Sequence, residues 1–164
     1  MKALVIYYSM EGNTRPTAKT IAEAAGADLL ELKPKKERSS RGFSRYLWGG
    51  KAAMMREKPA LLPLEADPDR YDMFFIGTPV WAWTLAPPLN SFLSGRDFSG
   101  KPVALFCCHG GGPGRIFRRM REAIPGAVFL GELGLRDPAK QETESQLELA
   151  KEWALEMLDA LQRQ

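Results

Sequence analysis

Residues 9–15 (Ser-Met-Glu-Gly-Asn-Thr-Arg) carry the groups in this sequence that are best suited to bind an anion. They follow an apolar run at residues 3–8, which predicts a strand, and a helix is expected to begin just after Thr14. A tight loop that opens onto a helix N-terminus gathers unpaired backbone N–H groups, and the helix dipole makes that point mildly positive. Phosphate is the natural ligand of such a loop. The alternative is an ordinary strand-to-helix turn capped by Thr14.

The loop lacks the motifs of two large nucleotide-binding classes. It has no Gly-Lys-Ser/Thr sequence, which would bring a lysine and a magnesium ligand to a triphosphate. It also lacks Gly-x-Gly-x-x-Gly, which disfavours a dinucleotide fold of the usual kind. A single phosphate monoester, held by N–H and hydroxyl groups without a strong cation, fits these residues better.

A second loop, residues 78–84, places Trp81 and Trp83 after another buried strand. Flat aromatic side chains at a strand end can stack on a flat ligand, and alternating positions point in opposite directions. The alternative is that one or both pack against a helix predicted to begin at Pro87. For Trp83 we expect a position in the core or at the rim of the site.

A third loop, residues 109–114, is rich in glycine and follows the fourth predicted strand. Glycines let the backbone approach a ligand closely, although they also suit a flexible turn before a helix. His109 is the single histidine of the chain, and its spacing from Cys107 and Cys108 gives no set of ligands around one metal. It is either a hydrogen-bonding neighbour of the ligand or a surface residue.

Strands and helices alternate along the chain, which predicts an α/β fold with a five-stranded parallel sheet covered by helices on both faces. We expect strands at residues 2–8, 28–32, 71–77, 103–108 and 127–130, and helices at residues 15–25, 87–93, 116–124 and 147–161. Residues 33–70 are too long for an ordinary connection, so a partly helical cover is expected there, with a helix at 43–55.

Open parallel sheets bind ligands beyond the carboxyl ends of their strands, where the three loops described above are expected to meet. A phosphate cradle, an aromatic platform and a glycine-rich edge together describe a planar heterocycle on a phosphorylated chain. Flavin mononucleotide (FMN) is such a ligand.

The composition is that of an ordinary globular protein, with 164 residues, 45% of them hydrophobic and 26% charged. No apolar run reaches the roughly 18 residues that span a membrane, and no secretory signal is evident. Cys107 and Cys108 are the only cysteines and should point to opposite faces of a strand, so they are poorly placed for a disulfide. We therefore expect a reduced, cytoplasmic protein without membrane insertion.

The net charge of +3 is unevenly distributed. Nine of the 23 basic residues, but only two of the 20 acidic ones, lie between Lys33 and Lys58. This segment makes the protein basic, and such an imbalance concerns its partners and not its fold.

The sequence resembles the flavodoxin family over nearly its whole length. Residues 9–14 resemble the family phosphate loop, usually written Ser/Thr-x-Thr-Gly-Asn-Thr, and residues 77–81 with 86–89 resemble the loop beside the flavin ring in a branch of short flavodoxins. Residues 109–112 stand where the family has its third loop, at the ring edge. The resemblance implies a flavodoxin-like three-layer sandwich with strand order 2-1-3-4-5, one domain over residues 1–164, and non-covalent FMN.

The resemblance also implies a set of cofactor-binding residues, with no catalytic residue and no metal ligand. The phosphate would be held by Ser9, Met10, Glu11, Gly12, Asn13 and Thr14, the ring would be lined by Thr78, Pro79, Val80 and Trp81, and its pyrimidine edge would meet Cys108, His109, Gly110, Gly111 and Gly112. Glu11 replaces a family hydroxyl, and its carboxylate is expected to point outward because a bare charge beside phosphate would be costly. His109 with three glycines also departs from the usual Thr/Ser-Gly-Gly.

Three functions compete at this stage. An electron carrier between a reductase and an acceptor protein is favoured, with FMN as its redox centre and either an acidic partner or docking through a face other than the basic segment. The alternative is an NAD(P)H-dependent FMN-containing reductase of quinones or similar small acceptors, which the same fold supports. Nucleic-acid binding by the basic segment, with Phe43, Tyr46 and Trp48 interleaved, is the third, and it is disfavoured because a solvated cationic face is commoner.

Overall fold

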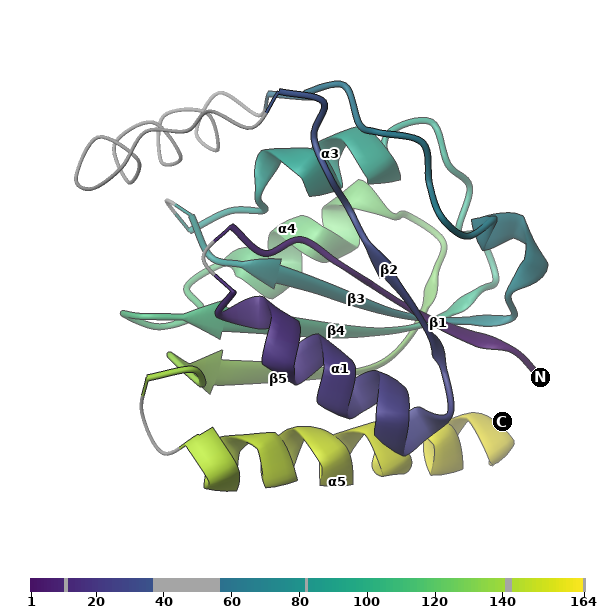
Figure 1. Ribbon diagram of the computed structural model, residues 1–164. Helices are drawn as coiled ribbons and strands as arrows, with labels where there is room; N and C mark the ends of the chain where they lie inside the picture. Colours follow the sequence, from purple (N-terminus) through teal and green to yellow (C-terminus); the bar gives the residue numbers. More distant parts are fainter. Residues whose placement is uncertain (11, 37–56, 82, 141–142, 164) are drawn as a thin grey trace.

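The computed structural model describes residues 1–10, 12–36, 57–81, 83–140 and 143–163. Its centre is a five-stranded, wholly parallel sheet in the order β2-β1-β3-β4-β5 (Figure 1). The strands are β1 (Ala3–Tyr7), β2 (Asp28–Glu31), β3 (Met73–Pro79), β4 (Pro102–His109) and β5 (Val128–Arg136). The predicted fold class and strand order are confirmed.

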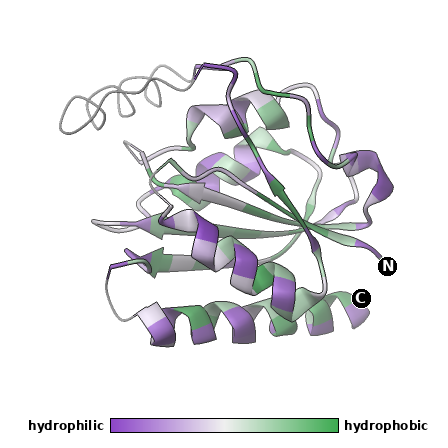
Figure 2. Cartoon of the chain, viewed as in Figure 1, coloured by the Kyte–Doolittle hydropathy of each residue, from purple (hydrophilic) through white to green (hydrophobic). Residues whose placement is uncertain are grey.

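The central strands are apolar along their whole length because both faces of the sheet are covered. All five residues of β1 are buried, and alternate residues of β1, β3 and β4 pack into two separate cores. One core includes Phe75 and Phe106, whose rings meet Trp153 of α5 edge to face. Figure 2 shows the hydrophobic colouring concentrated on the strands, with polar positions on the outer sides of the helices.

Helices cover both faces of the sheet, as predicted. α1 (Thr14–Ala25) and α5 (Thr143–Gln162) pack together on one face, while α3 (Pro87–Leu93) and α4 (Ile116–Ala123) cover the other (Figure 1). α1 ends at Gly26, which adopts a left-handed conformation (φ 59°) that returns backbone N–H bonds to the last turn. Among the residues that the structure describes, no helix has the length and apolar character needed to cross a membrane.

The extended passage after β2 lies along α3. Residues 33–35 pair with residues 60–62 through backbone hydrogen bonds of 2.7 and 2.8 Å. A 3-10 helix, η1 (Pro68–Arg70), then leads into β3. The helix predicted at 43–55 and most of the basic segment lie outside the described residues.

Most element boundaries differ from the prediction by a few residues, and two of the differences concern the start of α1 and the end of β5. Thr14 is the first residue of α1 and not its cap; Asn13 occupies the cap position without a side-chain capping bond. β5 continues from Val128 to Arg136, beyond the predicted end at residue 130. Gly131 interrupted the apolar pattern there, but its missing side chain makes room for Met157, whose sulfur would lie 2.6 Å from an added Cβ. The strand therefore continues beneath α5.

Candidate functional site

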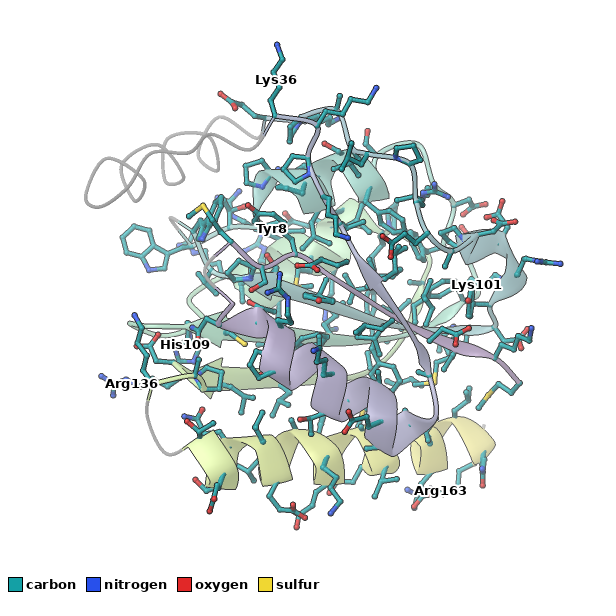
Figure 3. All side chains as sticks on the ribbon, viewed as in Figure 1. Tyr8, Lys36, Lys101, His109, Arg136 and Arg163 are labelled. Carbon is teal, nitrogen blue, oxygen red and sulfur yellow. The ribbon has the colours of Figure 1, made fainter. Side chains whose placement is uncertain are left out.

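A cavity of about 370 Å³ lies beyond the carboxyl ends of β1, β3 and β4. This volume falls in the range of small-molecule sites in proteins, roughly 300 to 1,000 Å³. Figure 3 shows Tyr8, His109 and Arg136 at this end of the molecule, with Lys101 and Arg163 at the other. The cavity is lined by residues of four loops: Ser9, Met10, Asn13, Thr14, Pro79, Val80, Trp81, Cys108, His109, Gly110, Asp137, Ala139 and Lys140.

The cavity wall beside the N-terminus of α1 contains two hydroxyl groups without partners. Ser9 is 6% exposed and Thr14 is fully buried. Neither Ser9 Oγ nor Thr14 Oγ1 has a hydrogen-bond partner of ordinary geometry in the described part of the chain, although the Thr14 hydroxyl lies near enough to the Cys108 thiol to oppose the rise in the pKa of that thiol. A buried hydroxyl left unpaired costs about 1–3 kcal/mol, so two of them beside one cavity mark a place prepared for a hydrogen-bonding ligand.

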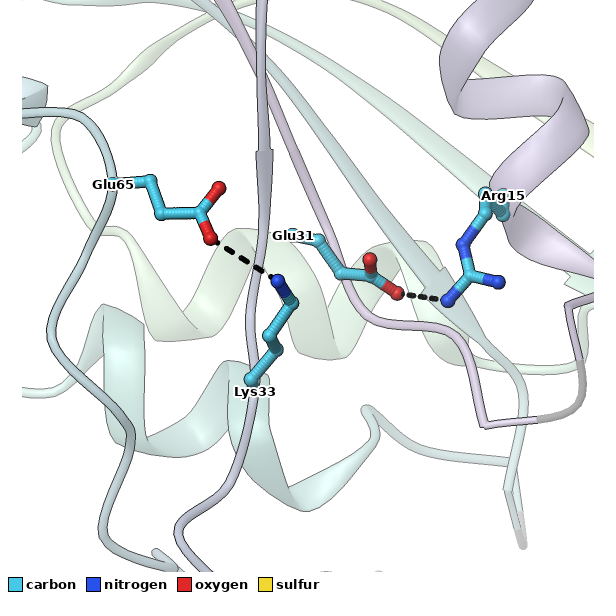
Figure 4. A network of polar contacts seen from close by, with 4 residues as sticks. All are labelled: Arg15, Glu31, Lys33 and Glu65. Carbon is cyan, nitrogen blue, oxygen red and sulfur yellow. Dashed lines mark hydrogen bonds and ion pairs between the residues drawn. The ribbon is translucent and has the colours of Figure 1, made fainter.

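The adjacent cation, Arg15, is directed away from this cradle. Its guanidinium pairs with Glu31 of β2 at 2.5 Å, next to a second pair between Lys33 and Glu65 at 3.1 Å (Figure 4). No acidic residue occupies the first turn of α1. At the N-terminus of α1 the positive character therefore comes from the backbone N–H groups and the helix dipole, which suits a monophosphate. Lys140 adds a cation to the cavity lining from the loop after β5.

The β3–α3 loop supplies the apolar wall. Trp81 packs edge to face on the buried ring of Tyr8, with ring centroids 5.6 Å apart. Thr78 lies behind the wall, where its hydroxyl donates to the Pro79 carbonyl at 2.8 Å and accepts from the Ala86 N–H at 3.1 Å. Thr78 thus holds the loop in shape while Trp81 faces the cavity.

The β4–α4 loop supplies the third wall. The Gly112 N–H donates to Nδ1 of His109 at 3.0 Å, which fixes the imidazole as an acceptor on that side. Burial lowers the pKa of His109, and Asp137 opposes part of that shift. The neutral ring therefore belongs to the folded state, and it shapes the turn of Gly110 to Gly112.

The two cysteines point to opposite sides of β4, as predicted. Cys107 enters the core beneath α3 and α4, whereas Cys108 lines the cavity, with its thiol 3.7 Å from the Thr17 hydroxyl of α1. Burial raises the pKa of Cys108 to about 11, so it is a neutral thiol at physiological pH. Both thiols are free, and no metal-binding cluster occurs among the described residues.

The loop after β5 forms part of the site and was missed by sequence reasoning. The side-chain amide of Asn13 makes two hydrogen bonds to this loop. Its oxygen accepts from the Ala139 N–H at 3.0 Å, and its nitrogen donates to the Asp137 carboxylate at 3.5 Å. Asp137 itself has a left-handed backbone (φ 41°). The signal was the position of residues 137–140 after a strand of the same parallel sheet, at the same edge as the other loops.

The structure gathers ten of the fifteen predicted site residues around this one cavity. Gly12, Thr78, Gly111 and Gly112 lie in the same loops without lining it, and Glu11 is outside the described residues. Trp83, expected in the core or at the rim, is instead 68% exposed. Contact of these residues with a cofactor stays a prediction.

The fold and this site define a class: a doubly wound α/β protein with an anion cradle and an aromatic wall at the carboxyl edge of its sheet. The family model described as Flavodoxin matches residues 2–149. The chain therefore belongs to the flavodoxin family, which confirms the predicted resemblance.

Solved structures agree with this assignment. A protein from Bacteroides uniformis assigned as a flavoprotein is 26% identical, with 93% of this chain and 96% of that chain covered and a TM-score of 0.74. A flavoprotein from Lactobacillus acidophilus, solved in complex with FMN, is 22% identical, with 88% and 98% covered and a TM-score of 0.69. Comparison with curated proteins gives no match.

Proposed function

We propose that this protein binds FMN in the cavity at the carboxyl edge of the sheet and carries electrons between partner proteins. The observation that carries the proposal is the pair of buried, unpartnered hydroxyls of Ser9 and Thr14 at the N-terminus of α1. Membership of the flavodoxin family and the FMN complex of the Lactobacillus acidophilus flavoprotein support FMN as the cofactor.

The residues divide the work of binding between the two ends of the cofactor. Ser9, Thr14 and the α1 N–H groups would hold the phosphate, and hydrogen bonds to such a charged group contribute about 1.5–3 kcal/mol each. Trp81, braced by Tyr8, would lie against the ring, and the Gly110 backbone would meet its edge. FMN supplies the redox chemistry, and the protein sets its potential through stacking, nearby charge and hydrogen bonds.

A direct assay distinguishes an electron carrier from an NAD(P)H-dependent reductase. We expect the purified protein to be yellow and to release a flavin that chromatography identifies as FMN. Mixed with NAD(P)H and a quinone, it should give no turnover above that of free FMN, while it should pass electrons from a reduced protein donor to a second protein. Saturable NAD(P)H oxidation would instead favour the reductase, and a colourless protein that takes up no added FMN would contradict the proposal.

A further inference from the structure

Trp83 is an exposed aromatic residue in an unfavourable backbone conformation. It is 68% exposed, and its φ of 58° lies in the left-handed region, which is sterically unfavourable for a residue with a Cβ. The turn is held by Trp81 and Thr84, which exchange two backbone hydrogen bonds of 3.0 and 3.2 Å. The fold thus keeps a large apolar ring in water at a conformational cost.

The ring of Trp83 lies on the turn that precedes α4. A Cβ added to Gly114 would lie 2.6 Å from Cδ1 of Trp83, so only glycine at position 114 allows this contact. The next residue, Arg115, forms the cap position of α4. Thr84, which follows Trp83, shares a small cavity of about 120 Å³ with Arg119 of α4. Trp81 and Gly110 line the FMN cavity. Trp83 follows Trp81 by two residues, and α4 begins six residues after Gly110, so Trp83 and the start of α4 form one surface next to the cavity-lining loops.

This surface carries several arginines at the N-terminus of α4, where the helix dipole disfavours positive charge. Arg115 stands at the cap of α4 and Arg118 in its first turn, which contains no acidic residue. Cations at a helix N-terminus oppose the macrodipole and destabilise the helix. Arg118 pairs with Glu122, whereas Arg115 and Arg119 have no ion pair within the described residues. Local preferences are broken in this way most often at functional surfaces.

We propose that the Trp83–α4 face, made of Trp83, Arg115, Arg118 and Arg119, is the docking surface for an acidic redox protein. Tryptophan and arginine are the residue types most enriched among those that dominate interface energies. The uncompensated positive charge selects an acidic partner, and its place next to the cavity-lining loops brings that partner close to the flavin. The assignment rests on the proposed function and adds the charge of the partner and the residues that receive it.

The test uses the whole chain of 164 residues with two redox proteins of opposite charge, an acidic electron donor and a basic electron acceptor. Reduced plant-type ferredoxin, an acidic iron–sulfur protein of low reduction potential, is mixed with the FMN-loaded protein, and flavin bleaching is followed by stopped flow. One electron leaves the ferredoxin cluster and enters the flavin. The second-order rate should fall as salt increases, whereas transfer from the reduced protein to cytochrome c, a basic haem protein, should become faster with salt.

Charge reversal locates the surface. R115E/R119E should lower the rate with ferredoxin by about tenfold or more at low salt, within the 10–10³ range of electrostatic steering. K2E/R163E makes the same change in net charge at the opposite end of the molecule, where Figure 3 shows Arg163, and should change the rate less than about twofold. W83N, which keeps a residue type tolerant of the left-handed conformation, should slow transfer with the salt slope unchanged.

The outcomes test the proposed function and the docking surface separately. The wild-type protein and every variant are first titrated with FMN. If the wild-type protein binds no FMN, only the proposed function is contradicted. Binding of oxidised ferredoxin to the flavin-free variants is measured by calorimetry, so the docking claim is tested even in that case. Equal effects of R115E/R119E and K2E/R163E on both measurements, or rates that do not depend on salt, would overturn the docking surface.

Discussion

Replacing Thr14 with valine tests two expected effects of its unpaired hydroxyl: destabilisation of the flavin-free protein and tighter binding of FMN. Thr14 Oγ1 is fully buried beside the cavity and has no hydrogen-bond partner of ordinary geometry in the described part of the chain. Valine has nearly the same shape and leaves the backbone N–H in place. In the absence of FMN the substitution removes a buried unsatisfied group, so the free energy of unfolding should rise by about 1 kcal/mol.

The same change should weaken FMN binding. A hydrogen bond to a charged phosphate contributes about 1.5–3 kcal/mol, and 1.4 kcal/mol corresponds to a tenfold change in affinity. T14V is therefore expected to bind FMN roughly 10 to 100 times more weakly, as measured by quenching of flavin fluorescence during titration. Chemical denaturation of the flavin-free protein measures the opposite effect on stability.

Thr17 provides the matched control one turn further along α1. It is equally buried, but its hydroxyl accepts a hydrogen bond from the Cys108 thiol at 3.7 Å and does not line the cavity. T17V should lose a little stability and keep its FMN affinity within about twofold, because only a weak S–H bond is removed. Wild-type affinity in T14V, or equal losses of affinity in both variants, would refute the phosphate cradle.

Three further predictions concern the core, the charge at the cavity and the single histidine. G77A should destabilise the fold by about 3 kcal/mol in chemical denaturation, because its Cβ would lie 2.0 Å from the buried ring of Phe106. D137N should tighten FMN binding about fivefold, since it removes a carboxylate from the wall of a phosphate site and asparagine tolerates the left-handed backbone. Burial lowers the pKa of His109, so the unfolded chain takes up its proton first and stability should fall as pH drops below about 6.5.

The contradicting results follow from matched variants. G111A adds a Cβ in open space at an ordinary φ, and a loss of stability equal to that of G77A would remove the packing argument. Unchanged or weaker FMN binding in D137N would show that the carboxylate does not oppose the phosphate. H109N keeps an acceptor for the Gly112 N–H but cannot titrate, and a pH dependence like that of the wild type would show that another group is responsible.

The strands and the site loops were predictable because their signals are local, whereas the strand order followed from the resemblance to the flavodoxin family. The apolar runs of β1, β3 and β4 show strands buried on both faces, and each is followed at once by residues suited to a ligand. The rule that ligands lie beyond the carboxyl ends of parallel strands then brings the loops together. This reasoning places Ser9, Trp81 and His109 at one site, and all three line the same cavity.

The features that sequence reasoning missed depend on tertiary contacts. Asn13 looked like a phosphate donor, but its side chain is used by the β5–α5 loop, and no local pattern reports that pairing. Trp83 was expected to be in the core or at the rim because tryptophan is usually buried, whereas its exposure depends on a two-residue turn and on contact with Gly114. The predicted end of β5 at residue 130 was wrong because a glycine, a common turn residue, follows it. The sequence does not show that Met157 fills the space beside Gly131.

The most direct measurement of the central claim compares FMN with riboflavin, which has the same ring and no phosphate, by calorimetric titration of the flavin-free protein. In the proposed site, the ring wall at Trp81 would be available to both ligands, whereas the Ser9 and Thr14 hydroxyls would bind only the phosphate of FMN. We expect one FMN per chain and an affinity for riboflavin at least about a hundredfold lower, from two hydrogen bonds to a charged group. Equal affinities for the two flavins, or no binding of either, would contradict the account.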